Sequence, residues 1–354
     1  MRTKDGRLYS GTLPKGCRMC ARGAKMVLLV TGKCHRTCFY CPLSEAKRGR
    51  DVVYANETVI EDMSQILLEA RQMRALGTGI TGGEPLLALK RTIDIITALK
   101  KEFGPAHHIH LYTTGDFDPE QVRTLAKAGL DEIRFHPPVE DWTTDRPGFL
   151  PVFLASKKTG LATGIEIPAI PGMHKEMTAL GRRFFGLGLD FLNLNELEVA
   201  EPNWKAFKKL GYETRGDGSA IKGSREAARK VMAALTGHSV HFCTSRYKDA
   251  VQLRKRLLRR ARTVARPYQV ITKDATLVFG IIEPEGDPAI FHEKLSGLLN
   301  GLRVPRSLYR FGPHRLELAP WVLETLVPCQ SYKAYIIETY PSSDALEVER
   351  TPLN

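Results

Sequence analysis

The stretch that decides the fold is residues 25–45, KMVLLVTGKCHRTCFYCPLSE, in which an apolar run leads into a loop with three cysteines. The run predicts a buried β-strand, because it is short, apolar and ends at a glycine. Cys34, Cys38 and Cys41 follow, four and then three positions apart. Four protein ligands close a structural zinc site, whereas three thiolates leave one metal position open to another molecule. A zinc site completed by His35 is the simpler alternative.

Five more strand-like segments follow, and helical patterns with apolar residues at i, i+3 or i+4 lie between them. The strand-like segments are 77–83, 108–114, 131–137, 163–170 and 190–196, and the helical patterns include 60–76, 91–103 and 119–129. Strand and helix in alternation predict parallel pairing with right-handed crossovers. Six such units fall short of a closed eight-stranded barrel. We therefore predict an incomplete (β/α)6 barrel, with its chemistry at the carboxyl ends of the strands.

Changes in pattern divide the chain into four parts. The predicted parts are an N-terminal segment with a CxxC motif (1–23), the barrel (24–200), an extension of the barrel with a basic helix (201–266) and an α+β domain (267–354). A further strand at 239–243 is a candidate addition to the barrel sheet. The last part predicts a mixed or antiparallel sheet, so the fold class is α/β with a C-terminal α+β accessory domain.

Composition indicates a globular protein. Of 354 residues, 43% are hydrophobic and 26% are charged. No apolar run reaches the roughly 20 residues that cross a bilayer, and the N-terminus lacks the apolar segment of a secretory signal. Seven unevenly spaced cysteines fit metal binding in a reducing compartment better than a disulfide framework. We expect no membrane span and a cytoplasmic location, and the sequence leaves the oligomeric state open.

A second motif, GITGGEPLL at 79–87, ends the second predicted strand. Gly82 and Gly83 allow the backbone to approach a ligand closely and to expose its carbonyl oxygens. The alternative is a simple strand-to-helix turn with Pro85 near the first helical turn. Two such motifs at adjacent strand ends are more specific together than either is alone.

These two motifs resemble those of the radical S-adenosylmethionine (SAM) enzymes. Cys34, Cys38 and Cys41 match the CxxxCxxC motif, with Tyr40 before the last cysteine, and GGEP matches the second signature. The resemblance implies a [4Fe–4S] cluster on the three thiolates, with the fourth iron bound by SAM. It also implies cleavage of SAM to a 5′-deoxyadenosyl radical that abstracts hydrogen, and a ferredoxin- or flavodoxin-type electron donor. Residues 24–200 look closest to the branch related to pyruvate formate-lyase activating enzymes and their uncharacterised archaeal and bacterial relatives.

The resemblance also suggests residues that contact SAM. It implies that the carbonyls of Gly82 and Gly83, together with Glu84, hold the amino group, and that Tyr40 lies by the adenine. The ends of the later strands resemble the family in general pattern and not in a specific motif. From this resemblance we assign further SAM contacts to Thr113, Thr114 and Glu166.

His136 follows the fourth predicted strand. It is a candidate donor to the SAM carboxylate or to the substrate. Its position beside Pro137 and Pro138 gives the alternative, a residue that only shapes a turn. The polar residues Asn193, Asn195 and Glu196 near the sixth strand carry no recognisable substrate code.

The remaining cysteines suggest a second metal site. Cys17 and Cys20 have CxxC spacing, and Cys243 and Cys329 follow at a distance. We predict zinc or an auxiliary iron–sulfur cluster at Cys17 and Cys20, with Cys243 as third ligand. Alternatively, Cys243 and Cys329 are small buried hydrophobic residues.

A basic helix is predicted at 245–266, with nine Lys or Arg residues and one acidic residue. Its predicted apolar stripe is Ala250, Leu253, Leu257, Ala261 and Val264. Its predicted exposed face is Lys255, Arg259, Arg262 and Arg266. Such a face is solvated charge or a surface for RNA phosphates, in line with the net charge of +13, and acidic lipid or a protein partner are further alternatives.

Three functions remain open at this point. The first is a radical SAM enzyme with an unidentified substrate, with RNA (tRNA) modification as one reading. The second is an activating enzyme that installs a glycyl radical on a protein. The third is a non-catalytic zinc-binding RNA adaptor.

Overall fold

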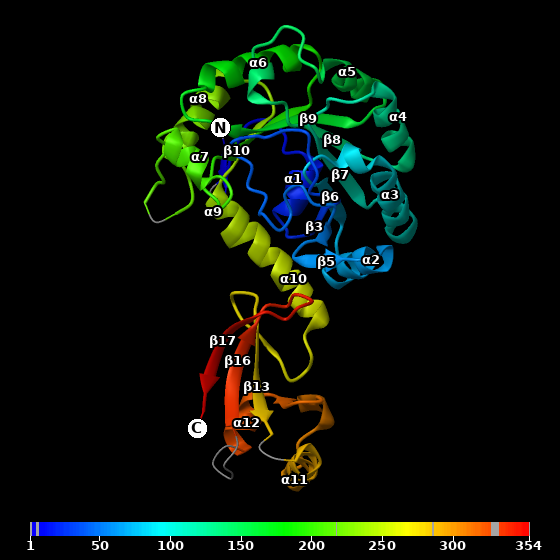
Figure 1. Ribbon diagram of the computed structural model, residues 1–354, viewed down its shortest axis with the longest axis vertical. Helices are drawn as coiled ribbons and strands as arrows, with labels where there is room; N and C mark the ends of the chain where they lie inside the picture. The colour runs from blue at the N-terminus through cyan, green and yellow to red at the C-terminus, as the bar shows by residue number, and fades with distance from the viewer. Residues whose placement is uncertain (1, 5–6, 217, 285–286, 327–332, 354) are drawn as a thin grey trace. The chain divides into compact units, whose positions relative to one another are not determined.

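The computed structural model describes residues 2–4, 7–216, 218–284, 287–326 and 333–353 (Figure 1). The chain forms two compact units. The first holds Met1–Arg71 and Ala75–Leu253, and the second holds Gln72–Arg74 and Arg254–Asn354. The division between the units falls inside the part 201–266 that the sequence pattern treats as one extension.

A curved parallel sheet forms the centre of the first unit (Figure 1). Its parallel strands are β3 (Lys25–Leu29), β6 (Gly77–Thr81), β7 (His108–Thr113), β8 (Glu132–Phe135), β9 (Ala162–Ala169), β10 (Phe191–Glu196) and β11 (Val240–Cys243). All six predicted strands are present, and β11 extends the sheet by parallel pairing with β10. The predicted fold class is confirmed.

Helices cover the outer face of this sheet, as Figure 1 shows. They are α2 (Met63–Gln72), α3 (Leu89–Phe103), α4 (Pro119–Ala128), α5 (Leu150–Lys158), α6 (His174–Gly186) and α8 (Ser224–Ala234). Alternate strand residues such as Ile80, Leu111 and Ile133 are fully buried and apolar. The residues between them point to the opposite face, because side chains alternate along a strand. That inner face carries His110 and Arg134, which is unusual for parallel strands, whose two faces are commonly apolar.

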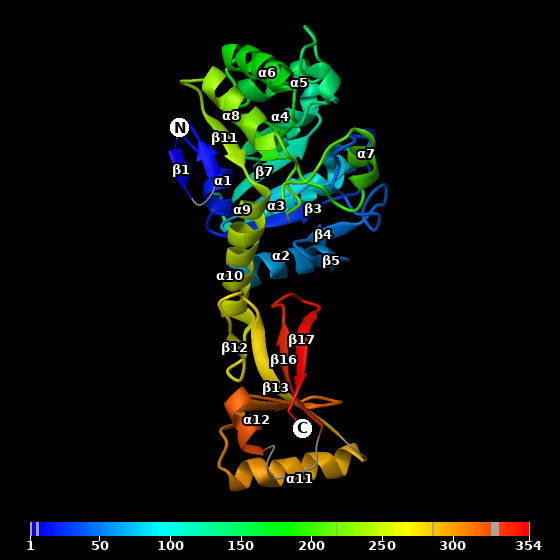
Figure 2. The same cartoon turned by 90° about the vertical axis from the view of Figure 1, so that its left-hand side faces the viewer.

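The N-terminal segment lies against the inner face and one edge of the sheet. β1 (Arg2–Lys4) and β2 (Arg7–Tyr9) form an antiparallel hairpin, and β2 pairs with β11, which places the hairpin beside β11 (Figure 2). α1 (Lys15–Cys20) contacts β3, β6 and β7 and lies inside the ring of strands in Figure 1. A Cβ atom on Gly16 would lie 2.5 Å from His110 Nδ1 and 2.6 Å from Arg134 Nη2. Only glycine therefore lets α1 approach the strands so closely.

A short hairpin follows the cysteine loop at the other edge of the sheet. β4 (Val53–Ala55) pairs antiparallel with β3, and β5 (Thr58–Ile60) pairs with β4. Asn56 has φ of 53° in the turn between them, and its side chain accepts a hydrogen bond from Val27 N at 3.0 Å. The sequence pattern did not predict this hairpin, because strands of three residues are too short to show a period.

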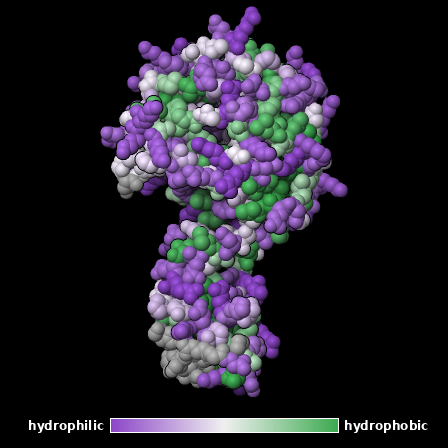
Figure 3. Space-filling view, viewed as in Figure 1, coloured by the Kyte–Doolittle hydropathy of each residue, from purple (hydrophilic) through white to green (hydrophobic). Residues whose placement is uncertain are grey.

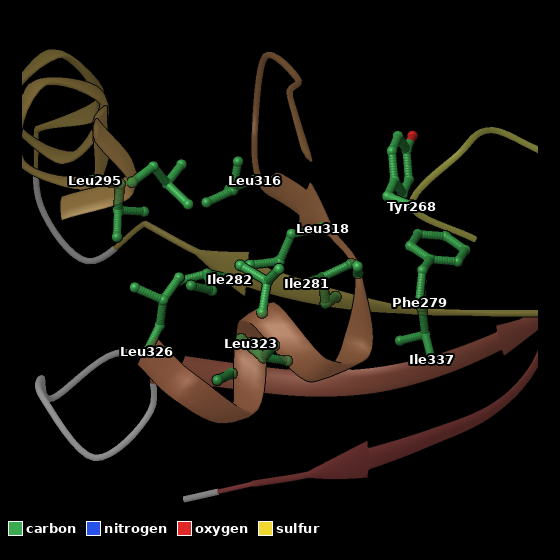
Figure 4. Close-up of a cluster of buried hydrophobic side chains, with 14 of the residues drawn as sticks. Tyr268, Phe279, Ile281, Ile282, Leu295, Leu316, Leu318, Leu323, Leu326 and Ile337 are labelled. Carbon is green, nitrogen blue, oxygen red and sulfur yellow. The ribbon is translucent and has the colours of Figure 1, made fainter. Parts of the chain in front are cut away.

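The second unit holds an antiparallel sheet with its own hydrophobic core (Figure 4). Its strands are β12 (Val270–Ile271), β13 (Leu277–Glu283), β14 (Tyr309–Phe311), β15 (Leu316–Leu318), β16 (Lys333–Thr339) and β17 (Glu347–Pro352). The helices of this unit include α11 (Pro288–Gly301) and α12 (Pro320–Leu326). Figure 4 shows Ile282, Leu316, Leu318 and Leu323 among the side chains of this core.

The basic helix is irregular, and its faces differ from those predicted. It consists of α9 (Ser245–Tyr247), a π-helical stretch Lys248–Leu253 and α10 (Arg254–Val264). Leu257 and Ala261 are buried as predicted, but Ala250 is exposed, because the wider π-helical turn shifts the register of the apolar stripe.

Lys255 and Arg259 are half-buried, contrary to the predicted exposed face. The Nε atom of Arg259 donates to Met73 O at 3.2 Å, and its guanidinium also bonds the Arg74 carbonyl. The neighbouring Arg260 is buried and bonds Pro341 O and Gln72 Oε1. These guanidinium groups therefore hold the second unit together, and Arg262 and Arg266 remain exposed.

Hydrophilic side chains cover most of the face of the molecule shown in Figure 3. Within the described part of the chain, no helix has the length and apolarity of a membrane span.

Candidate active site

The three cysteines of the first motif lie in the loop after β3, at the carboxyl end of the strand. Cys34 is exposed, whereas Cys38 and Cys41 are partly buried. Burial raises the pKa of the Cys34 and Cys38 thiols. Among the described residues, no three metal-ligating side chains converge closely enough to hold one ion. Three thiols in one loop fit a four-iron cluster, in which each thiolate binds a different iron. The zinc alternative with His35 stays a prediction.

The cysteine loop closes on itself through backbone contacts. Gly32 N donates to Arg50 O at 2.8 Å, and Gly49 N donates to Gly32 O at 2.8 Å. A Cβ atom on Gly32 would lie 1.6 Å from Lys47 O, so no other residue fits there. Arg48 Nη2 donates to Cys41 O at 3.1 Å. These contacts join the two ends of the loop at Gly32 and Arg50 and tie Arg48 to Cys41.

The GGEP turn after β6 packs directly on the cysteine loop. Gly83 N donates to Thr31 O and Glu84 N donates to Lys33 O, both at 2.8 Å. A Cβ atom would lie 2.5 Å from Thr31 O on Gly82 and 2.2 Å from Lys33 O on Gly83. The glycines are thus required by the close approach of two loops. Among the described residues, no donor reaches the carbonyl oxygen of either glycine.

Glu84 is fully buried and joins the ends of β6 and β7. Oε1 accepts from Leu86 N and Thr113 Oγ1, both at 3.0 Å, and Oε2 accepts from Thr114 N at 2.7 Å and Thr114 Oγ1 at 2.9 Å. Burial raises the pKa of Glu84, and these hydrogen bonds oppose that effect. The side chains predicted to contact SAM, Glu84, Thr113 and Thr114, therefore contact one another. They position the strand ends that flank the cysteine loop.

His136 links Tyr40 to β9. Its Nδ1 lies 2.7 Å from Glu166 O, which can only accept, so Nδ1 carries the proton. Burial lowers the pKa of His136, which favours the neutral ring. Its Nε2 therefore accepts from the Tyr40 hydroxyl at 3.1 Å. The imidazole anchors Tyr40. The role of His136 as a donor to the SAM carboxylate or to the substrate stays a prediction.

A buried ion-pair network occupies the inner face of the barrel. Arg134 donates to Glu132 Oε1 at 2.6 Å through Nε and to Glu166 Oε2 at 2.7 Å through Nη1. Asn193 and Asn195 donate to Glu166 at 2.8 and 2.9 Å. Burial alone would raise the pKa of both carboxyls. The Arg134 charge lowers them, together with hydrogen bonds from His108 to Glu132 and from Asn193 and Asn195 to Glu166. Glu166, predicted to contact SAM, thus lies at the centre of this network.

Sequence reasoning missed Glu132 and Arg134. The signal was present in DEIRFHP (131–137), where charged residues alternate with apolar ones in a strand of a parallel sheet. Glu196, named with Asn193 and Asn195, faces away from them and accepts from Ser245 N at 3.0 Å.

The other cysteines line the same inner face. Cys17 Sγ accepts from Asn193 Nδ2 at 3.4 Å and from Arg134 Nη2 at 3.6 Å, and Cys243 Sγ accepts from Gln252 Nε2 at 3.5 Å. Burial raises the pKa of Cys17 and of Cys243 to about 12. The second metal site at Cys17, Cys20 and Cys243 stays a prediction, and Cys329 lies outside the described residues.

Comparison with known proteins places this geometry in a family. A family model described as the radical SAM superfamily matches residues 28–151. A Methanocaldococcus jannaschii protein described as a "Putative glycyl-radical enzyme activating enzyme" is 40% identical over 360 residues, which cover 96% of this chain and 93% of the relative. The chain belongs to the radical SAM superfamily. This radical SAM protein is therefore an enzyme, and its family uses a [4Fe–4S] cluster and SAM.

Other similarities cover less of this radical SAM enzyme. An S-adenosyl-L-methionine-dependent 2-deoxy-scyllo-inosamine dehydrogenase of Niallia circulans is 31% identical over 108 residues, 29% of this chain and 40% of the relative. Among solved structures, SuiB of Streptococcus suis has a TM-score of 0.43 at 13% identity, covering 63% of this chain and 49% of that chain. A model described as a domain of unknown function (DUF8061) matches residues 275–353.

Proposed function

We propose that this enzyme cleaves SAM reductively at a [4Fe–4S] cluster held by Cys34, Cys38 and Cys41. The observation that supports the assignment is the packing of the cysteine loop against the GGEP turn at the carboxyl ends of β3 and β6. The ligand count fits as well, because three thiolates leave one iron for SAM. When bound, the cluster and SAM supply one-electron cleavage of a carbon–sulfur bond, which gives methionine and a 5′-deoxyadenosyl radical that abstracts hydrogen from the substrate.

In this proposal, residues of the chain bind and orient SAM. The carbonyl oxygens of Gly82 and Gly83 accept no protein donor among the described residues, so they suit the SAM amino group. We propose Tyr40 as the adenine neighbour, with His136 fixing its hydroxyl. Glu84 affects SAM binding indirectly, by fixing the ends of β6 and β7, since both of its carboxylate oxygens accept hydrogen bonds within the protein. Thr113, Thr114 and Glu166 support the site in the same indirect way.

Anaerobic reconstitution with iron and sulfide tests this proposal. Reconstituted enzyme with dithionite and SAM is expected to form 5′-deoxyadenosine and methionine in equal amounts, because both come from one bond cleavage. The control omits dithionite and should form neither. An iron-loaded protein that forms no 5′-deoxyadenosine under these conditions would contradict the proposed activity.

We propose two candidate classes of substrate. Hydrogen abstraction from a protein glycine, as in glycyl-radical activation, is supported by the name of the relative that matches almost the whole chain. Modification of RNA remains the other candidate, supported by exposed Arg262 and Arg266, although Arg259 and Arg260 bond within the protein. A non-catalytic zinc-binding RNA adaptor is disfavoured, since the chain belongs to an enzyme superfamily.

A further inference from the structure

The segment between β10 and β11 packs on the cysteine loop. Its helix α7 (Trp204–Lys209) is preceded by Asn203, whose Nδ2 donates to Tyr40 O at 3.2 Å. The ring of Phe39 lies 6.0 Å from that of Phe207 and 6.4 Å from that of Tyr212, centroid to centroid. Phe39 is bonded directly to Cys38 in the chain. The segment therefore touches residues adjacent to a proposed cluster ligand.

This segment carries a surface recess of about 410 Å³. The recess is lined by Val199, Trp204, Phe207, Lys208, Gly211, Tyr212, Glu213, Thr214 and Ile221. Phe207 is buried at its base, whereas Trp204 is 45% exposed. Tyr212 stacks on Phe39 with an angle of 23° between the rings. One aromatic ring, that of Phe39, thus separates the lining of the recess from the backbone of Cys38.

Three lysines on α7 have no carboxylate partner in the described part of the chain, and one of them, Lys208, lines the recess. Lys205, Lys208 and Lys209 are exposed on α7, which has no acidic residue. Among the described residues, no carboxylate lies within ion-pair distance of these three ammonium groups. Lys222 differs, because it pairs with Glu213 at 2.6 Å. Lys205 Nζ lies 5.8 Å from the centre of the Trp204 ring. Three ammonium groups without a described carboxylate partner, beside the exposed ring of Trp204, fit a partner with an acidic face.

We propose that α7 and this recess form the docking surface for the acidic, low-potential electron-transfer protein that reduces the cluster. The proposal rests on the proposed function, which places the cluster at Cys34, Cys38 and Cys41. The reaction moves one electron from the reduced donor to the cluster and makes or breaks no bond. Electron-transfer complexes are typically small and weak, and charge steers their association. A single short helix with three lysines beside a recess of this size matches that kind of contact.

Charge reversal of α7 tests the proposal. In the variant K205E/K208E/K209E, SAM cleavage driven by reduced ferredoxin or flavodoxin should fall about tenfold or more at low ionic strength. The difference should shrink as salt is added, because salt screens exposed charges. Cleavage driven by dithionite should stay within about twofold of wild type, since a small reductant needs no docking surface. The matched control K127E/R229E/K230E reverses three exposed cations on α4 and α8 and should leave both rates unchanged.

Each other outcome contradicts the docking surface. Unchanged rates with ferredoxin and flavodoxin would show that the lysines do not bind the donor. An equal fall with dithionite would show that they act on the fold or the cluster. Reduction of wild type by dithionite but by neither protein donor would also overturn the proposal. Failure of SAM cleavage with dithionite in wild type would instead refute the proposed function.

Discussion

Replacing Cys34, Cys38 and Cys41 together by Ala is expected to abolish SAM cleavage. The loss follows because no other side chain in the loop can replace three thiolates as iron ligands. Reconstituted wild type should carry about four more irons per chain than the triple variant, and 5′-deoxyadenosine should fall to the level of the reductant-free control. Iron analysis and chromatography of the products measure the two quantities.

The variant C17A/C20A is the matched control for this experiment. It removes two thiols that lie on α1, outside the cysteine loop, and should leave dithionite-driven SAM cleavage measurable. Iron that remains in the triple variant and disappears when Cys17, Cys20 and Cys243 are also replaced would locate a second cluster. Unaltered iron content in the triple variant would show that the cysteine loop holds no cluster.

Replacing Arg134 by Met should destabilise the protein more than any surface change. The guanidinium is 2% exposed and bonds both Glu132 and Glu166, so its removal leaves two buried carboxylates without their cation. Breaking a buried ion pair in this way costs about 3–5 kcal/mol. Urea unfolding of the cluster-free protein at pH 7 measures the loss. In the matched control R123M, whose ion pair with Glu120 is exposed, the expected change is about 0–1 kcal/mol.

The difference in stability between wild type and the Arg134→Met variant should depend on pH in a defined direction. In wild type the pKa values of Glu132 and Glu166 are lowered in the folded state, because the Arg134 charge and the hydrogen bonds to both carboxyls together outweigh burial. Their stabilisation is therefore full above the ordinary glutamate pKa of about 4.3 and is lost as pH falls through the folded values. Without Arg134 both pKa values should rise relative to wild type, so the variant should lose less stability than wild type as pH falls from 7. The gap between the two proteins should narrow toward pH 4.3, and a constant gap would show that the ion pairs are not its cause.

The sequence was sufficient to predict the parallel strands and the cysteine loop. Strands such as β3 and β9 have the expected length and apolar content, and the helices between them show a clear period. The hydrogen-bond partners of the site's side chains were harder to predict. Glu84 was assigned to SAM from its motif, but its four donors come from Leu86, Thr113 and Thr114, and contacts across strand ends depend on register.

Other parts could not be predicted because local patterns do not encode them. The position of α1 inside the barrel depends on Gly16, which resembles any loop glycine until His110 and Arg134 are placed beside it. The faces of the basic helix were wrong in part, since a π-helical turn shifted the register and Arg259 found backbone partners distant in sequence. The β4–β5 hairpin was missed because its strands have three residues each.

Electron paramagnetic resonance of the reduced, reconstituted enzyme tests the central claim most directly. If three thiolates leave one iron open, addition of SAM should change the spectrum of the reduced cluster. The variant with Cys34, Cys38 and Cys41 replaced by Ala should lack this SAM-sensitive signal. A wild-type cluster spectrum that saturating SAM leaves unchanged, or a SAM-sensitive signal that survives in the triple variant, would contradict the assignment.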